Sequence, residues 1–361
     1  MKKFKKVLAL VLSLFLVTLT LVACSSGTNS TNNTNNNSKN SSNVSNQSNN
    51  AKKRIAIVVK STGNPYNEKE IEGFKNALKE LGDEAIVQEP VQPTADAQIQ
   101  IIQQLTAQKV DAIAIAANDP DALQPALQKA MDAGIKVLSF DSATNAQSRM
   151  VHVNQADPEM IGRTLVQAIA TMIGGKGQIA ILSATSQATN QNTWISWMKK
   201  ELEKPEYKNI QLVKIAYGDD LRDKSVSETQ GLLQAYPNLK GIISPTTVGI
   251  AAAAKVLTDK GLKGKVQLTG LGLPSEMAAY IKSGVCQWMY LWNPIDVGYL
   301  TGYAADALAK GKISGKVGDT IDAGRLGSKA VVKADDGGTQ TLLGAPFKFD
   351  IKNIDEWAKV Y

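Results

Sequence analysis

The chain has 361 residues, of which 43 % are hydrophobic and 20 % are charged. Single hydrophobic cores stop growing at about 250–300 residues, so this length favours two domains and excludes a disulfide-stapled peptide or a wholly disordered chain. The net charge is +7, but four lysines lie within the first six residues, and the rest of the chain carries 36 basic against 33 acidic residues. A nucleic-acid-binding protein needs a basic cluster in its folded part, and the sequence has none.

The amino terminus has the pattern of an export signal. The cationic segment MKKFKK precedes the apolar run VLALVLSLFLVTLTLVA, and Cys24 follows directly. The run is short for a bilayer span of about 20 residues, which favours cleavage after residue 23 over an uncleaved membrane helix, the alternative. Leu21-Val22-Ala23-Cys24 resembles the lipobox of bacterial lipoproteins. That resemblance implies lipid modification of Cys24, which would anchor the exported protein to the outer face of the cell membrane.

Residues 24–50 are nearly all Ser, Asn, Thr and Gly. Such a composition has too few apolar side chains to offset the entropy of ordering, so we expect a disordered tether here. Cys286 has no partner once Cys24 is lipid-modified, so no intrachain disulfide is expected. Cys286 lies in an apolar stretch, and we expect it to be a small buried side chain.

From Lys52 onward, short strand-like runs alternate with amphipathic stretches of helical length. This alternation is typical of parallel sheets with crossover helices, an α/β fold. The first series predicts strands at 54–59, 84–89, 112–116 and 137–141 and helices at 67–81, 95–108 and 120–133. The second predicts helices at 157–173, 192–202, 224–235 and 249–260 and strands at 178–183, 210–217, 241–244 and 266–271. Two series of domain size indicate two similarly built lobes.

The loops that follow the strands are rich in amides, hydroxyls and isolated charges. They are 60–66, 117–119, 141–144, 184–191, 245–247 and 272–274. Ligands of open α/β sheets bind beyond the carboxyl ends of the strands, so two facing lobes bring these loops into one cleft. Such a lining suits a small, neutral, polyhydroxylated ligand held by hydrogen bonds.

Several stretches resemble the type I periplasmic-binding-protein family, whose members deliver sugars to ABC importers. They are Asn118-Asp-Pro-Asp-Ala-Leu123, the segment from Ala130 to Ser142, Thr189-Asn-Gln-Asn192 with Trp194, and Leu291-Trp292. The resemblance covers about residues 52–361. It implies two Rossmann-like lobes joined by a three-segment hinge, with 51–154 and 275–320 in the first lobe and 155–274 and 321–361 in the second.

Two subfamilies match these stretches best, the autoinducer-2 receptors and the rhamnose-binding proteins. The autoinducer-2 receptors hold their ligand with a lysine, an aspartate, an Asp-Gln pair, a proline and an alanine. The matching residues here are Lys60, Asp141, Gln191 and Pro245. Asn190 stands where that subfamily has aspartate, and Thr247 stands where it has alanine.

Both departures coincide with the rhamnose-like patterns Asn-Gln-Asn and Pro-Thr-Thr. The similar sugar binders, however, carry two adjacent aromatic residues after Asn-Pro, whereas this chain has Tyr66-Asn67. The missing aromatic favours a smaller ligand, so autoinducer-2 is the preferred prediction and rhamnose or a related sugar is the alternative.

Three further residues are candidate ligand contacts. Tyr66 and Trp292 are aromatic residues of the cleft loops or of the core, and Asp119 is a contact or only the N-cap of the helix after it. Asn190 could both cap its helix and bind ligand. Asp141 could instead form an Asx turn, Lys60 could be a solvated loop charge, and Pro245 and Thr247 could be ordinary turn residues.

Enzymatic functions have little support in the sequence. His152 is the only histidine and lies in the apolar run Met-Val-His-Val, so we expect neither a catalytic triad nor a metal site. Gly270-Leu-Gly272 lacks the third glycine of a dinucleotide fingerprint, and no cofactor is expected. The protein is therefore predicted to be a monomeric solute-binding lipoprotein, not an enzyme, that presents its ligand to an ABC permease; a glycan-acting enzyme is the remaining alternative.

Overall fold

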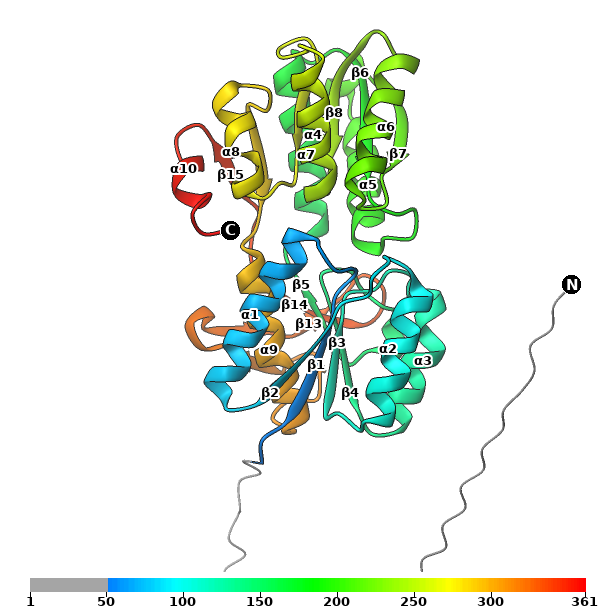
Figure 1. Cartoon of the computed structure of the whole chain (residues 1–361), viewed down its shortest axis with the longest axis vertical. Coiled ribbons are helices and arrows are strands. Elements are labelled where there is room, and N and C mark those ends of the chain that lie inside the picture. The colour runs from blue at the N-terminus through cyan, green and yellow to red at the C-terminus, as the bar shows by residue number, and fades with distance from the viewer. Residues whose placement is uncertain (1–50) are drawn as a thin grey trace, which may run out of the picture. The chain divides into compact units, whose positions relative to one another are not determined.

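The computed structural model describes residues 51–361 (Figure 1). The predicted signal peptide (1–23), the predicted tether (24–50) and Cys24 lie outside the described residues. Within residues 51–361, no helix is both long enough and apolar enough to cross a membrane.

The described chain is built from α-helices, β-strands and three short 3-10 turns. The strands are β1 (Arg54–Val58), β2 (Glu84–Gln88), β3 (Ala112–Ile115), β4 (Lys136–Phe140), β5 (His152–Asn154), β6 (Gly177–Ser183), β7 (Ile210–Tyr217), β8 (Leu239–Ser244), β9 (Gln267–Gly270), β10 (Trp288–Leu291), β11 (Thr320–Asp322), β12 (Ser328–Ala330), β13 (Val332–Lys333), β14 (Thr339–Leu342) and β15 (Phe347–Asp350). The helices are α1 (Pro65–Leu81), α2 (Ala95–Ala107), α3 (Pro120–Asp132), α4 (Pro158–Ile173), α5 (Thr189–Leu202), α6 (Arg222–Ala235), α7 (Thr247–Asp259), α8 (Pro274–Ser283), α9 (Pro294–Ala309) and α10 (Ile354–Trp357). The 3-10 turns are η1 (Ala146–Ser148), η2 (Pro205–Tyr207) and η3 (Gly324–Leu326).

The first lobe is a seven-stranded sheet with the order β13-β14-β5-β4-β3-β1-β2, parallel except for β13. Alternate residues of its central strands point to opposite faces. Ile55 and Ile57 pack with α1, whereas Ala56 and Val58 pack with α2 and α3. Because both faces are covered, β1 is apolar and buried from Ile55 to Val58, after the half-buried Arg54 at its start.

The second lobe has a four-stranded parallel sheet with the order β7-β6-β8-β9. Helix α4 packs against α5, and α6 packs against α7. The antiparallel pair β10 and β15 extends this lobe, because Leu271, directly after β9, bridges to Tyr290 of β10. The α/β class and the parallel sheets expected from the sequence are confirmed.

Strand pairing differs from two of the lobe boundaries predicted from the sequence. Strand β14 pairs with β5 of the first sheet, although residues 321–361 were expected in the second lobe. Helix α8 packs against α7 and α10, although residues 275–320 were expected in the first lobe. We therefore propose that the chain crosses between the lobes at 155–157, 292–293 and 343–346.

The elements expected before residue 275 occur with small shifts, whereas no elements were predicted after it. Helix α1 begins at Pro65 rather than residue 67, because the side chain of Asn64 accepts a hydrogen bond from the amide of Tyr66. Helix α5 begins at Thr189 rather than residue 192, which places Asn190 and Gln191 in its first turn. The strands after residue 275 are two to four residues long, too short to give a periodic pattern.

Cys286 is fully buried, as expected, and burial raises the pKa of its thiol to about 12. The thiol is therefore protonated at neutral pH and serves as a small packing group.

Helices α1 and α9 lie side by side on the first sheet (Figure 1) and approach unusually closely through glycine. A Cβ atom added at Gly298 of α9 would overlap the backbone carbonyl of Glu70 in α1. A Cβ atom at Gly73 of α1 would in turn overlap the carbonyl of Ile295. Backbone atoms cannot yield as a flexible side chain can, so these glycines set the distance between the two helices.

We expect Gly298→Ala to lower the free energy of unfolding by about 1–3 kcal/mol, the usual cost of overpacking. Denaturant unfolding of the purified protein measures this change. Gly231→Ala is the matched control, because Gly231 lies in α6 with no atom within 4 Å of an added Cβ. That control should gain about 0.5–1 kcal/mol from helix propensity. Equal stability of Gly298→Ala and the wild type would show that the helices do not meet at this position.

His152 lies on β5 and is 5 % exposed. Its Nδ1 lies 2.9 Å from the hydroxyl oxygen of Ser139. Burial, and next the charge of Arg149, lower the pKa of the imidazole to about 3, although the charge of Asp336 acts in the opposite direction. His152 is therefore neutral in the folded protein across the physiological range.

The buried imidazole makes stability depend on pH. Because the folded pKa lies below the ordinary value of about 6.5, unfolding takes up a proton, and the contribution of His152 is present above pH 6.5 and lost as the pH falls towards 3. As the pH falls from 6.5 towards 3, we expect the free energy of unfolding of the wild type to decrease more steeply than that of His152→Gln. The difference in slope should be about 1.4 kcal/mol per pH unit. Denaturant titrations at several pH values measure the difference. A folded-state imidazole NMR signal that titrates near pH 6.5 would contradict it.

Candidate functional site

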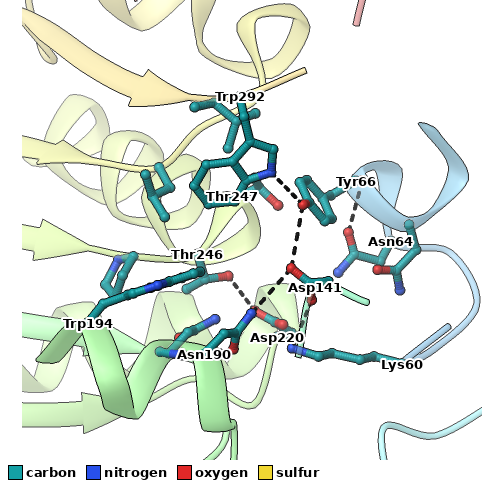
Figure 2. A pocket seen from close by; sticks show the side chains of 15 residues that line it. Lys60, Asn64, Tyr66, Asp141, Asn190, Trp194, Asp220, Thr246, Thr247 and Trp292 are labelled. Atoms are coloured by element: carbon teal, nitrogen blue, oxygen red, sulfur yellow. Dashed lines mark hydrogen bonds and ion pairs between the residues drawn. The ribbon is translucent and has the colours of Figure 1, made fainter. Parts of the chain in front are cut away.

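The loops at the carboxyl ends of both sheets meet in one pocket between the lobes (Figure 2). Its wall combines amides, hydroxyls, two carboxylates, one lysine and three aromatic side chains. The lining residues are Lys60, Asn64, Tyr66, Asn67, Asp141, Asn190, Gln191, Trp194, Asp220, Pro245, Thr246, Thr247, Leu271, Leu291 and Trp292.

A buried ion pair occupies the first-lobe side of this pocket. Lys60 follows β1 and Asp141 follows β4, and the Nζ atom lies 3.3 Å from Oδ2. The two side chains are only 9 % and 7 % exposed. Asp141 has a φ of +53°, a left-handed conformation that aspartate tolerates better than most residues. The pair is held in an environment where leaving either charge unpartnered would be costly.

Amide side chains fix the backbone that carries Lys60. The Nδ2 atom of Asn118 donates to the carbonyl of Lys60 at 2.9 Å. Gln98 of α2 donates to the carbonyl oxygens of Val59 and Ala116, at 3.1 and 2.7 Å. These bonds tie the end of β1 to the end of β3, and so position the lysine at the base of the pocket.

Several hydrogen bonds join the lobes beside the pocket. The Nδ2 atom of Asn190 donates to Oδ1 of Asp141 at 3.2 Å, and the hydroxyl of Ser142 lies 3.0 Å from that of Thr189. Gln191 lies beside Asn190, and its Oε1 accepts hydrogen bonds from the hydroxyl of Ser183 and the amide of Ala184. The carbonyl end of Gln191 is therefore engaged by its own lobe, whereas its Nε2 has no hydrogen-bond partner among the described residues and is left as a donor for the pocket.

Three aromatic side chains form the opposite wall of the pocket. The ring centroids of Trp292 and Tyr66 lie 6.5 Å apart in an edge-to-face arrangement, and Trp292 and Trp194 lie 5.7 Å apart. The indole Nε1 of Trp292 donates to the hydroxyl of Tyr66 at 2.7 Å, and that hydroxyl donates to Asp141 at 3.5 Å (Figure 2). An apolar face is thus coupled by hydrogen bonds to the buried ion pair.

Behind Tyr66 lies Glu70, fully buried in α1. Within the described residues neither of its carboxyl oxygens has a hydrogen-bond partner. Burial, and next the charge of Asp141, raise the pKa of Glu70 well above its ordinary value, although Lys60 opposes this. Burial and the charge of Glu70 likewise raise the pKa of Tyr66. Both shifts favour protonated, uncharged groups next to the pocket.

Eight of the residues predicted from the sequence line this pocket: Lys60, Tyr66, Asp141, Asn190, Gln191, Pro245, Thr247 and Trp292. Asp119 does not lie among the lining residues. Its Oδ1 accepts hydrogen bonds from the amides of Asp121 and Ala122, at 3.0 and 3.1 Å, so it is the N-cap of α3. These bonds support the N-cap interpretation, so Asp119 is not included among the ligand contacts proposed below.

Sequence reasoning missed several lining residues. Asp220 lies three residues beyond the end of β7, so the strand-end rule that selected the other loops also applies to it. Trp194 lies one turn after Asn190 in α5 and was noted only as part of a family pattern. Asn64 and Thr246 lie within loops that were identified as a whole. Leu271 and Leu291 carried no recognisable signal, since apolar residues at strand ends also occur in cores.

The arrangement supplies hydrogen-bond acceptors, amide and ammonium donors, and an apolar face. His152 is not among the residues that line this pocket. Within residues 51–361, no group of three or more His, Cys, Asp or Glu side chains is placed to hold a metal ion. Acceptors beside donors and aromatic rings are suited to hold a small hydroxylated molecule.

Comparisons with known proteins fit this geometry. A solved ABC transporter solute-binding protein from Clostridium phytofermentas, with bound L-rhamnose, is 52 % identical, with a TM-score of 0.84 over 86 % of this chain and 99 % of that one. LsrB from Clostridium saccharobutylicum, in complex with AI-2, is 25 % identical, with a TM-score of 0.79 over 84 % of this chain and 99 % of that one.

Among curated proteins, the D-ribose/D-allose-binding protein of Pseudomonas aeruginosa is 26 % identical over 241 residues, or 64 % of this chain and 75 % of its own length. The sequence profile of the periplasmic binding protein domain matches residues 55–313, more than half of the chain. The two lobes, the pocket between them and this match lead to one conclusion: the chain belongs to the periplasmic binding protein family.

Proposed function

We propose that this protein is the exported sugar-binding component of an ABC importer and that it captures L-rhamnose between its lobes. The observation that carries the proposal is the pocket, in which hydrogen-bonding residues from both lobes face three aromatic rings. The 52 % identity to a solute-binding protein with bound L-rhamnose supports the choice of sugar.

The chemistry of the pocket suits a deoxyhexose. The Asp141 carboxylate accepts ligand hydroxyls, and Lys60 and the amide of Gln191 donate to ligand oxygens. Tyr66, Trp194 and Trp292 offer apolar faces for the C–H face of a pyranose ring and for a methyl group. Asn190, Pro245 and Thr247 complete the second-lobe side. We propose that the ligand contacts are Trp194 and the eight predicted residues that line the pocket; Asp119, the ninth predicted residue, is left out.

Autoinducer-2 is the second candidate, supported by the structural similarity to LsrB in complex with AI-2. The comparisons favour rhamnose, the alternative in the sequence analysis, because the identity to the L-rhamnose-bound protein is twice as high. The structure also weakens the reason for preferring a smaller ligand. Asn67 replaces an aromatic residue after Tyr66, but Trp194 from α5 brings another aromatic side chain to the pocket.

A binding function without turnover agrees with the relatives, whose names are those of binding proteins of sugars and transported solutes. The permease partner and export follow from the family. The lipid anchor at Cys24 and the monomeric state stay predictions of the sequence.

We expect L-rhamnose to bind saturably, one molecule per chain, in isothermal titration calorimetry, with no new chemical species formed on prolonged incubation. D-ribose and autoinducer-2, titrated in parallel, should bind more weakly. Because contacts from both lobes favour closure, small-angle scattering should show the protein becoming more compact at saturation, and unchanged compactness would count against closure. Tight binding of autoinducer-2 without rhamnose binding would reverse the order of the two ligands, and a new product would indicate an enzyme.

We expect Asp141→Asn to weaken L-rhamnose binding and Asp141→Ala to abolish detectable binding. Removing a charged acceptor costs about 1.5–3 kcal/mol, or about 10- to 150-fold in the dissociation constant. Asn keeps the shape of the side chain and tolerates the positive φ, so Asp141→Asn separates charge from folding.

Asp119→Asn is the control for this experiment, because asparagine caps helices as well as aspartate and residue 119 lies outside the pocket. Its affinity should equal that of the wild type. Undiminished binding by Asp141→Asn would remove Asp141 from the site.

A further inference from the structure

Two adjacent aspartates after β7, Asp219 and Asp220, share a positive φ but have different surroundings. Both have a φ of +53°, in the left-handed region. Asp219 forms an ion pair with Lys224 of α6 and is not among the residues lining the main pocket. Asp220 is half-buried, lines that pocket from the second-lobe side, and accepts a hydrogen bond from the hydroxyl of Thr246 (Figure 2).

The turn that holds Asp220 is anchored to the second sheet. The amides of Gly218 and Asp219 donate to the carbonyls of Ser183 and Ala184, at 2.9 and 3.2 Å. A Cβ atom at Gly218 would overlap the hydroxyl of Ser225, so this residue has to be glycine for the turn to pack on α6. These two hydrogen bonds hold the turn against the end of β6. The loop that follows β6 continues into α5, whose first turn contains Asn190 and Gln191.

Asp220 lies where the pocket meets the surface. It also lines a neighbouring depression together with Val91 and Leu221, which are 77 % and 43 % exposed. A ligand entering or leaving between these loops would pass its carboxylate.

The charges around Asp220 are not balanced. Lys60 is the one basic side chain among the described residues that line the pocket, and it already pairs with Asp141 at 3.3 Å. Arg222, two residues beyond Asp220, pairs with Glu276. The pocket therefore holds two carboxylates, one from each lobe, against one ammonium group. Burial raises the pKa of Asp220, and Lys60 and Thr246 offset this only in part, while Asp141 raises it further.

Two like charges on opposite lobes repel each other, and hydrogen-bond donors that lie between them offset this repulsion. The hydroxyls of a neutral sugar are such donors, and each carboxylate can accept more than one of them. An acidic sugar would instead add a third negative charge. The unbalanced carboxylate thus both attracts a neutral polyol and disfavours an anion.

We propose that Asp220 is a specificity-determining ligand contact, whose carboxylate accepts a hydroxyl of the bound sugar from the second lobe and selects neutral over acidic sugars. This inference rests on the proposed function, because it assumes that a sugar occupies the pocket. It adds a second carboxylate to the proposed site, so that hydroxyls of one bound sugar donate to both Asp141 and Asp220 and thereby bridge the two lobes.

The test compares Asp220→Asn with the matched control Asp219→Asn by calorimetry with L-rhamnose. Asparagine keeps the shape and tolerates a positive φ, so both variants change only charge and one acceptor. We expect Asp220→Asn to bind L-rhamnose about tenfold or more weakly, since a charge-assisted bond becomes a neutral one. Asp219→Asn should bind like the wild type.

Two further readouts separate ligand contact from a structural role. Without ligand, the melting temperature of Asp220→Asn should equal or exceed that of the wild type, because a poorly partnered charge is removed. A lower value together with the weaker binding would indicate a structural role and overturn the inference.

D-galacturonate is the acidic probe, and it should bind the wild type at least about tenfold more weakly than L-rhamnose. Equal or tighter binding would overturn the inference.

The outcomes distinguish this inference from the proposed function. If the wild type binds L-rhamnose and Asp220→Asn binds it equally well, Asp220 is not a ligand contact and only the inference fails. If the wild type binds no neutral sugar, the proposed function fails and the inference fails with it.

Discussion

Lys60 and Asp141 form an ion pair away from solvent, and the character of the pocket depends on it. Removing two charges from water costs several kcal/mol per ion before their attraction is counted, so such a pair persists only where further hydrogen bonds satisfy it. Asn190, Gln155 and Tyr66 provide these bonds to Asp141, and Asn118 holds the backbone of Lys60. The pair is thereby fixed with acceptor capacity left for a hydroxylated ligand.

The fold explains why groups so far apart in the chain meet at this pair. Parallel strands present their carboxyl ends at one edge of each sheet, and the two sheets face each other across the pocket. Trp292 lies directly after β10, in one of the proposed connections between the lobes, and its indole donates a hydrogen bond to Tyr66 at the start of α1. The position of α1 is fixed in turn by its close glycine-mediated packing against α9.

The same residue type has different roles in this protein according to its surroundings. Asp119 caps a helix, Asp219 pairs with a lysine, Asp141 pairs with Lys60, and Asp220 has no cation of its own. Only the last two face the pocket. Where the protein gives a carboxylate too few hydrogen-bond donors, the hydroxyls of a ligand can provide the missing ones. This is the physical basis for assigning sugar recognition to this cleft.

The sequence by itself determined the α/β class, the alternating elements up to residue 274 except β5, and the loops that line most of the pocket, because buried parallel strands are apolar runs and their following loops are polar. The loops that carry Lys60, Asp141, Asn190 and Gln191 were predicted in this way, and the resemblance to the autoinducer-2 receptors then singled out these four residues. The sequence could not separate Asp119 from Asp141, since both follow a strand. Only the tertiary structure decided that one carboxylate is engaged by helix amides and the other by a lysine 81 positions earlier in the chain. It likewise decided that β14 joins the first sheet and that Trp194 and Asp220 reach the pocket, because strand pairing and side-chain proximity are set by long-range packing, which leaves no local pattern in the chain.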